Sequence, residues 1–148
     1  MRLVVLLTVL LAGCATPPGP APEAEPKSEA PPPVAAPTPK ENIAIAGLMD
    51  SARTEAAAGN LAGAAASLER ALRIEPRNPR LWHELARVRL KQGQYAQAES
   101  VAARSNSWVG EDKALRAENW RLISESRNAR GDQEGAKAAL EAASRVAP

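Results

Sequence analysis

Apolar residues recur along the second half of the chain at the spacing of an α-helix. The clearest stripe, with steps of three and four, consists of Leu61, Ala64, Ala65, Leu68, Ala71 and Leu72. Such spacing places the apolar side chains on one face of a helix. Gly59, Gly93 and Gly131 interrupt the helical pattern at points where a helix would end in a left-handed residue. The pattern therefore predicts short amphipathic helices that turn at these three glycines.

Capping residues in the sequence also indicate where helices begin. Thr38 can cap a helix that has Pro39 in its first turn and Glu41 closing a capping box. Asn78 and Pro79 form a second start of this kind, and Asn60 and Asp132 are N-caps directly after two of the glycines. The chain is therefore expected to be helical from residue 39 to its end.

The helical segments repeat. Gly59 lies 34 residues before Gly93, and the same step relates Leu61 to Tyr95 and Ala64 to Ala98. Gly131 lies 38 residues after Gly93, and this longer step relates Trp82 to Trp120 and Ala98 to Ala136. The units are predicted at 45–78, 79–112 and 117–148. Four extra residues before the third unit, close to one helical turn, predict a longer first helix there.

This arrangement resembles the tetratricopeptide repeat (TPR). The signature positions of the family are matched by Gly59, Trp82, Gly93, Tyr95, Ala98, Trp120, Gly131 and Ala136. The resemblance implies an all-α fold, a short α-solenoid of three TPR-like helix-turn-helix pairs. Because each pair buries only one face by itself, three units are near the minimum for a stable stack. A plain up-down helical bundle is the structural alternative.

The last helix has no partner after it in the sequence. Lys137, Glu141, Ser144 and Arg145 lie on one side and would make this helix its own cap. Alternatively, Ala139 and Val146 would stay open to a partner or a second copy. We expect the self-capping arrangement.

The N-terminus carries a short apolar run from Leu3 to Leu11, after Arg2 and before the only cysteine. The run is too short to cross a bilayer as a helix but has the length of a signal-peptide core. Leu11-Ala12-Gly13-Cys14 resembles the lipobox of bacterial lipoproteins. The resemblance implies a signal peptide at 1–13, lipidation of Cys14 with palmitate-type chains, and, because Ala15 is not aspartate, the periplasmic face of the outer membrane.

Residues 14–38 form a linker of proline, alanine and a few charged residues. Such a composition cannot bury enough apolar surface to fold, so the linker is expected to be disordered. At about 3.1 Å per residue it would span roughly 70 Å. We interpret it as a spacer between the lipid and the domain at 39–148, and a proline-rich docking peptide is the alternative.

Composition excludes several kinds of chemistry. With Cys14 lipidated, no thiol remains for a disulfide or a metal, and the single histidine, His83, cannot form a histidine metal site. His83 is expected at the surface, and Trp82 and Trp120 in the core. Charge is nearly balanced, at a formal +2, which does not indicate a nucleic-acid partner. We expect no cofactor apart from the lipid, no small-molecule substrate and no enzyme activity.

In the TPR family, the first helix of each pair lines a concave groove that holds peptides. By position, the candidates for partner binding are Arg53, Arg80, His83, Glu84, Arg87, Lys91 and Arg121. Arg80, Glu84, Arg87 and Lys91 share one helical face, on which Glu84 could pair with both arginines. This face is either solvated and self-paired or a basic groove for an acidic tail of a periplasmic protein.

The sequence therefore favours a membrane-anchored scaffold that binds other proteins of the envelope. Lipoproteins with such repeats serve cell-wall enzymes, outer-membrane assembly or pilus biogenesis, and the sequence does not choose among these. The alternative is a cell-wall-binding or enzymatic protein that acts directly on peptidoglycan. A closed polar cavity around His83 would favour that alternative, whereas an open groove would favour the scaffold.

Overall fold

The computed structural model describes residues 39–147, with side chains from residue 43. All elements in this range are α-helices: α1 (Pro39–Ala57), α2 (Leu61–Ile74), α3 (Pro79–Lys91), α4 (Tyr95–Trp108), α5 (Lys113–Ala129) and α6 (Gln133–Val146). The predicted signal, Cys14 and the linker lie outside the described residues. Within them, no helix combines the length and the apolar character that a membrane span requires.

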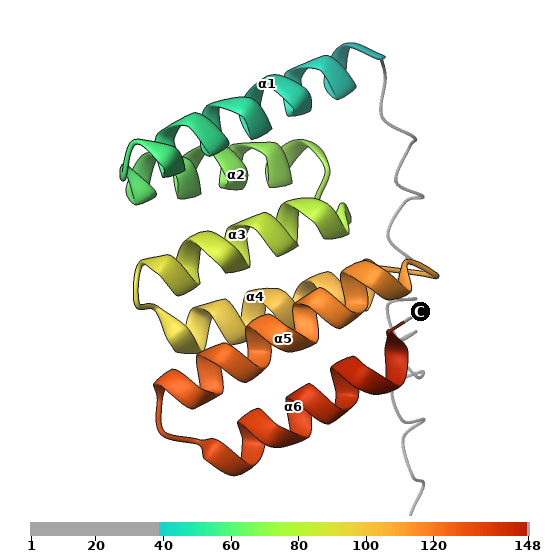
Figure 1. The fold of residues 1–148 in the computed structure, drawn as a ribbon. Coiled ribbons are helices and arrows are strands. Elements are labelled where there is room, and N and C mark those ends of the chain that lie inside the picture. The colour runs from blue at the N-terminus through green and yellow to red at the C-terminus, as the bar shows by residue number, and fades with distance from the viewer. Residues whose placement is uncertain (1–38, 148) are drawn as a thin grey trace, which may run out of the picture. The chain divides into compact units, whose positions relative to one another are not determined.

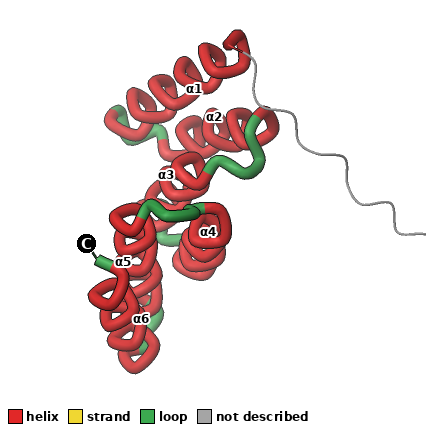
Figure 2. Tube along the Cα trace, turned by 90° about the vertical axis from the view of Figure 1, so that its right-hand side faces the viewer, coloured by secondary structure: helices red, strands yellow, loops and turns green. Residues whose placement is uncertain are grey.

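The helices pack as consecutive antiparallel pairs, α1 with α2, α3 with α4 and α5 with α6 (Figures 1 and 2). Successive pairs are joined by contacts of α2 with α3 and of α4 with α5, and α3 also contacts α5. The predicted all-α stack of three helix pairs is therefore confirmed, and the plain bundle is excluded because the pairs follow one another along the stack.

The three turns within the pairs have the same geometry. Gly59, Gly93 and Gly131 have φ angles of 80°, 72° and 84°, as the sequence predicted. The amide after each glycine donates to the carbonyl five residues earlier, with N to O distances of 2.8, 2.9 and 3.0 Å. This is the Schellman ending of a helix, in which a left-handed residue lets the chain turn back.

N-caps fix the starts of the helices that follow. The side chain of Asn60 accepts from the Gly63 amide and that of Asp132 from the Gly135 amide, as expected. Asn78 caps α3 and has Pro79 in the first turn, also as expected. A further cap, Asp112 on α5, was not predicted; it follows Gly110, which has a φ of 56°. α5 has 17 residues against 13 in α3, which matches the longer helix that the insertion predicted.

Small side chains bring the helices close together at their crossing points. Ala64, Ala71, Ala86, Ala98 and Ala102 have no exposed surface. Leu68, Leu81 and Leu85 fill the space between α1, α2 and α3, and Ile123 does so between the second and third pairs. Trp82 and Trp120 are partly buried against these clusters, so both tryptophans pack as the repeat positions implied.

The outer face of α6 is mostly polar. The four polar residues predicted to cap the stack, Lys137, Glu141, Ser144 and Arg145, are exposed, whereas Ala139 is buried against the third pair. Leu140 is the apolar exception, with 51% of its surface exposed.

Candidate protein-binding groove

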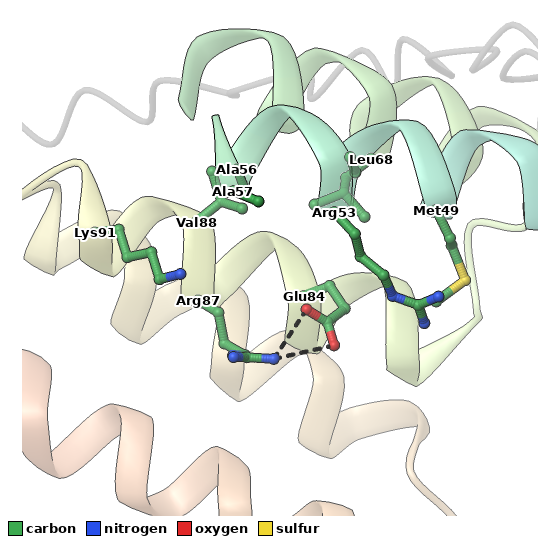
Figure 3. Close-up of a pocket in the computed structure, with 10 residues that line it drawn as sticks. Met49, Arg53, Ala56, Ala57, Leu68, Glu84, Arg87, Val88 and Lys91 are labelled. Atoms are coloured by element: carbon green, nitrogen blue, oxygen red, sulfur yellow. Dashed lines mark hydrogen bonds and ion pairs between the residues drawn. The ribbon is translucent and has the colours of Figure 1, made fainter. Parts of the chain in front are cut away.

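The first helices of the three pairs, α1, α3 and α5, border two adjoining clefts. The first cleft lies between α1 and α3 and encloses a cavity of about 200 Å³. Its floor is apolar and is formed by Ala52, Ala56, Leu68 and Val88. Its rim is mostly charged and consists of Met49, Arg53, Glu84, Arg87 and Lys91 (Figure 3). An apolar floor below charged groups suits the side chain of a bound peptide.

The second cleft lies between α3 and α5, is wider and more open, and has a volume of about 380 Å³. Its walls are His83, Arg87, Glu118, Arg121, Leu122 and Glu125. Because Arg87 borders both clefts, the two form one groove along α3, which we call the α1–α3–α5 groove. Six of the seven candidate residues from the sequence analysis line this groove, and Arg80 is the exception: Arg53, His83, Glu84, Arg87, Lys91 and Arg121.

Charge is uneven along the groove. Three cations, Arg53, Arg87 and Lys91, surround the first cleft, and Glu84 is the carboxylate among them. Arg87 pairs with Glu84 at 3.2 Å (Figure 3). Arg53 pairs with Asp50 at 3.0 Å in an exposed contact. Lys91 has no ion pair within the described residues. Each exposed ion pair of this kind contributes about 0.2–1 kcal/mol to stability, so a carboxylate of a partner can replace it.

The predicted pairing of Glu84 with both arginines is half wrong. Glu84 pairs with Arg87, but Arg80 instead contacts Asp112 at 3.1 Å. Arg80 lies in the first turn of α3, where the loop between α4 and α5 brings Asp112 within reach. Arg80 borders neither cleft and ties the start of α3 to the loop before α5.

The prediction of a surface position for His83 is wrong. His83 is 8% exposed and lies below the second cleft, with its Nδ1 2.9 Å from Oδ1 of Asn119 on α5. Asn119 donates from Nδ2 to Ser105 Oγ at 2.7 Å and to Asn106 Oδ1 at 3.0 Å. The Oδ1 of Asn119 is therefore an acceptor, so Nδ1 of His83 carries the proton. Nε2 lies 3.6 Å from Glu118 Oε2.

We refer to His83, Asn119, Ser105 and Asn106 as the buried polar network. It joins α3, α4 and α5, and the Ser105 hydroxyl continues it to the Pro79 carbonyl at 2.8 Å. The sequence analysis missed Asn119 and Ser105 as parts of this network. Ser105 lies one helical turn after Ala102, and Asn119 one turn before Ile123, so both fall on the apolar faces of their helices. This gave a weak signal, because a polar residue at a buried position must have a partner.

The sequence analysis also missed the floor of the first cleft. Ala52 and Ala56 lie one turn apart on α1, and Glu84 and Val88 one turn apart on α3. This spacing, applied to the face of α1 that carries Met49 and Arg53, would have identified the two alanines.

Among the remaining signature residues, Ala98 and Ala136 are buried and Tyr95 is partly buried beside its glycine turn. Trp108, for which the repeat offered no role, is 40% exposed. Cys14 lies outside the described residues.

Comparison with known proteins agrees with this architecture. A family described as "Tetratricopeptide repeat" matches residues 55–117. Among solved structures, the chain is similar to the globular C-terminal domain of LpoP from P. aeruginosa, with 44% sequence identity and a TM-score of 0.66. The match covers 68% of this chain and 94% of that domain. No protein of curated function matches the sequence.

Proposed function

The chain belongs to the tetratricopeptide-repeat family, with the C-terminal domain of LpoP as a homologue, and from this premise we propose that it is a lipid-anchored scaffold that binds an envelope protein. The binding site in this proposal is the α1–α3–α5 groove. The ligand is an acidic segment of the partner, with an apolar side chain in the first cleft. Cys14 carries the lipid, and its neighbour Ala15 favours the periplasmic face of the outer membrane.

The observation that carries the proposal is the composition of the first cleft. Val88, Leu68 and two alanines form a floor that water solvates poorly, and three cations surround it. Desolvating an apolar side chain there supplies affinity, and forked hydrogen bonds from Arg53 and Arg87 to carboxylates supply orientation. Met49 adds a flexible apolar wall that adapts to different side chains.

The alternative function, direct action on peptidoglycan, has less support. His83, the residue on which a catalytic pocket would have been built, donates to Asn119 below an open cleft. Its proton is therefore engaged in a hydrogen bond that positions α3 against α5. This role supports a scaffold over an enzyme.

Crosslinking in intact envelopes tests the groove. A photo-crosslinking amino acid that replaces Ala57, at the edge of the first cleft, should yield a covalent adduct with a partner protein. The same amino acid replacing Ala138, an exposed residue on α6, is the matched control. Adducts from position 138 but not from position 57 would contradict the groove as the binding site.

Charge reversal tests the acidic nature of the ligand. Arg87→Glu should weaken capture of the crosslinked partner about tenfold, because one forked contact is lost and a repulsion is added. Lys137→Glu, which makes the same charge change on exposed α6, should leave capture unchanged. Equal capture by both variants would show that the arginines of the groove are merely solvated.

A further inference from the structure

One end of the domain exposes both apolar side chains and arginines. The loops from α2 to α3 and from α4 to α5 lie at this end, as does the start of α1 (Figure 1). Of the large apolar residues exposed in the described part of the chain, three belong to it: Ile43 near the start of α1, Ile74 at the end of α2 and Trp108 at the end of α4. Their exposed fractions are 75%, 36% and 40%.

Two arginines stack on two tryptophans at this end. The guanidinium of Arg77 lies 5.0 Å from the ring centre of Trp108, and that of Arg104 lies 5.3 Å from the ring centre of Trp82. Arg104 and Trp108 are one turn apart on α4, and Trp82 Nε1 donates to the carbonyl of Pro76, next to Arg77, at 2.8 Å. These contacts make one continuous group, which we call the Arg–Trp cluster: Arg77, Trp82, Arg104 and Trp108.

The charges of the cluster are not neutralised by the domain itself. Neither Arg77 nor Arg104 forms an ion pair within the described residues, and neither does the exposed Arg73 nearby in sequence. Glu75, two residues before Arg77, accepts from Asn78, and Asp112, in the loop after Trp108, is paired with Arg80. Stacking on the rings holds both guanidinium groups in place with their N–H edges available to anions.

We propose that this end of the domain docks on an anionic phospholipid surface. The arginines bind lipid phosphates, and Trp108, Ile74 and Ile43 enter the interface. Tryptophan and arginine suit this layer because each has an apolar body and a polar or charged tip. The inference rests on the proposed lipid anchor in one respect: the chain that precedes α1 leads to Cys14, so the anchor would keep this end of the domain within reach of the membrane.

The geometry favours lipid over an acidic protein segment. The exposed apolar side chains come from the ends of three different helices. Ile74 lines an open cleft between α1 and α2, and neither Ile43 nor Trp108 lines that cleft, so the three side chains do not share one cavity. A peptide would need such a cavity to bury its side chains, whereas a bilayer surface can receive scattered side chains separately.

Vesicle co-sedimentation of the unlipidated chain, starting at Ala15, tests the proposal. The chain should bind vesicles of phosphatidylglycerol and phosphatidylcholine and not vesicles of phosphatidylcholine alone, and 0.5 M salt should release it. The double variant Arg77→Glu and Arg104→Glu should reduce the bound fraction at least fivefold, and Trp108→Ser should reduce it about twofold to threefold. Lys137→Glu, on exposed α6, should bind as wild type.

Thermal unfolding of each variant, followed by circular dichroism, separates misfolding from lost binding. If the double variant melts early, Arg77→Gln and Arg104→Gln, which remove charge without adding repulsion, take its place. The proposal would be overturned if the wild type and the folded charge variants bound the vesicles to the same extent. So would capture of the chain by polyglutamate without capture by vesicles, because the ligand would then be an acidic protein. None of these results depends on the groove, whose test is the adduct at position 57.

Discussion

Asn119 has no exposed surface, and its amide connects three helices. Both kinds of amide atom are used: the oxygen accepts from His83, and the nitrogen donates to Ser105 and Asn106. A buried network of this kind specifies one arrangement of its helices, because any other arrangement leaves polar atoms without partners. At the scale of the residue, Asn119 therefore determines how α5 lies on α3.

Asn119→Ala should lower the free energy of unfolding by about 2–3 kcal/mol, because it leaves the His83 N–H and the Ser105 hydroxyl with fewer partners in a buried site. Urea denaturation measures the change. Asn128→Ala, on the exposed side of the same helix, is the control and should change stability by at most about 0.5 kcal/mol. Similar losses in the two variants would contradict the network's role.

At the scale of the element, the helix pairs depend on their turns. Each pair reverses direction at one left-handed glycine, and the hydrogen bonds at the three turns agree within a few tenths of an ångström. The direction of the chain is therefore set locally, by the backbone at each turn.

Gly93→Val should destabilise the domain by at least about 1–2 kcal/mol, because a β-branched residue is strained at a φ of 72°. The midpoint of urea unfolding reports the loss.

Gly47→Ala is the matched control. Gly47 lies within helix α1, and a Cβ there would meet nothing within 4 Å. This variant should be neutral or more stable by up to about 1 kcal/mol. If Gly93→Val unfolds at the same urea concentration as wild type, the turn does not require glycine.

At the scale of the whole molecule, a lipid anchor would restrict the groove to one compartment. Cys14→Ala should abolish incorporation of labelled palmitate in growing cells, because no other thiol is present in the chain. Thr16→Ala, two residues further on, should be labelled as wild type. A labelled Cys14→Ala protein would refute lipidation at this cysteine.

The sequence predicted what is local and periodic. The turns were predictable because glycine adopts left-handed backbone angles, as at Gly59, Gly93 and Gly131. Small residues such as Ala98 indicate where helices cross. The three helix pairs therefore followed from the amino-acid sequence. The general location of the groove on α1, α3 and α5 followed from the repeat as well.

Contacts across the stack were not predictable in the same way. His83 meets Asn119 across 36 residues, and Arg80 meets Asp112 across 32. Whether His83 points toward α5 or toward water depends on the rotation of α3 and on the four residues that lengthen α5. A shift of one residue turns a helical side chain by about 100°, so a repeat assignment cannot decide between these two directions.

Because of the buried polar network, the two sides of the groove are held in place differently. α3 and α5 are joined by it, whereas α1 faces α3 across a cavity and is supported by α2. We expect a larger ligand side chain to be accommodated by a movement of α1, while α3 and α5 keep their spacing. The cleft between α1 and α3 should therefore accept ligand side chains of different sizes, whereas the cleft beside Arg121 should accept only a narrow range of sizes. Related partners would then differ most in the size of the residue that contacts α1.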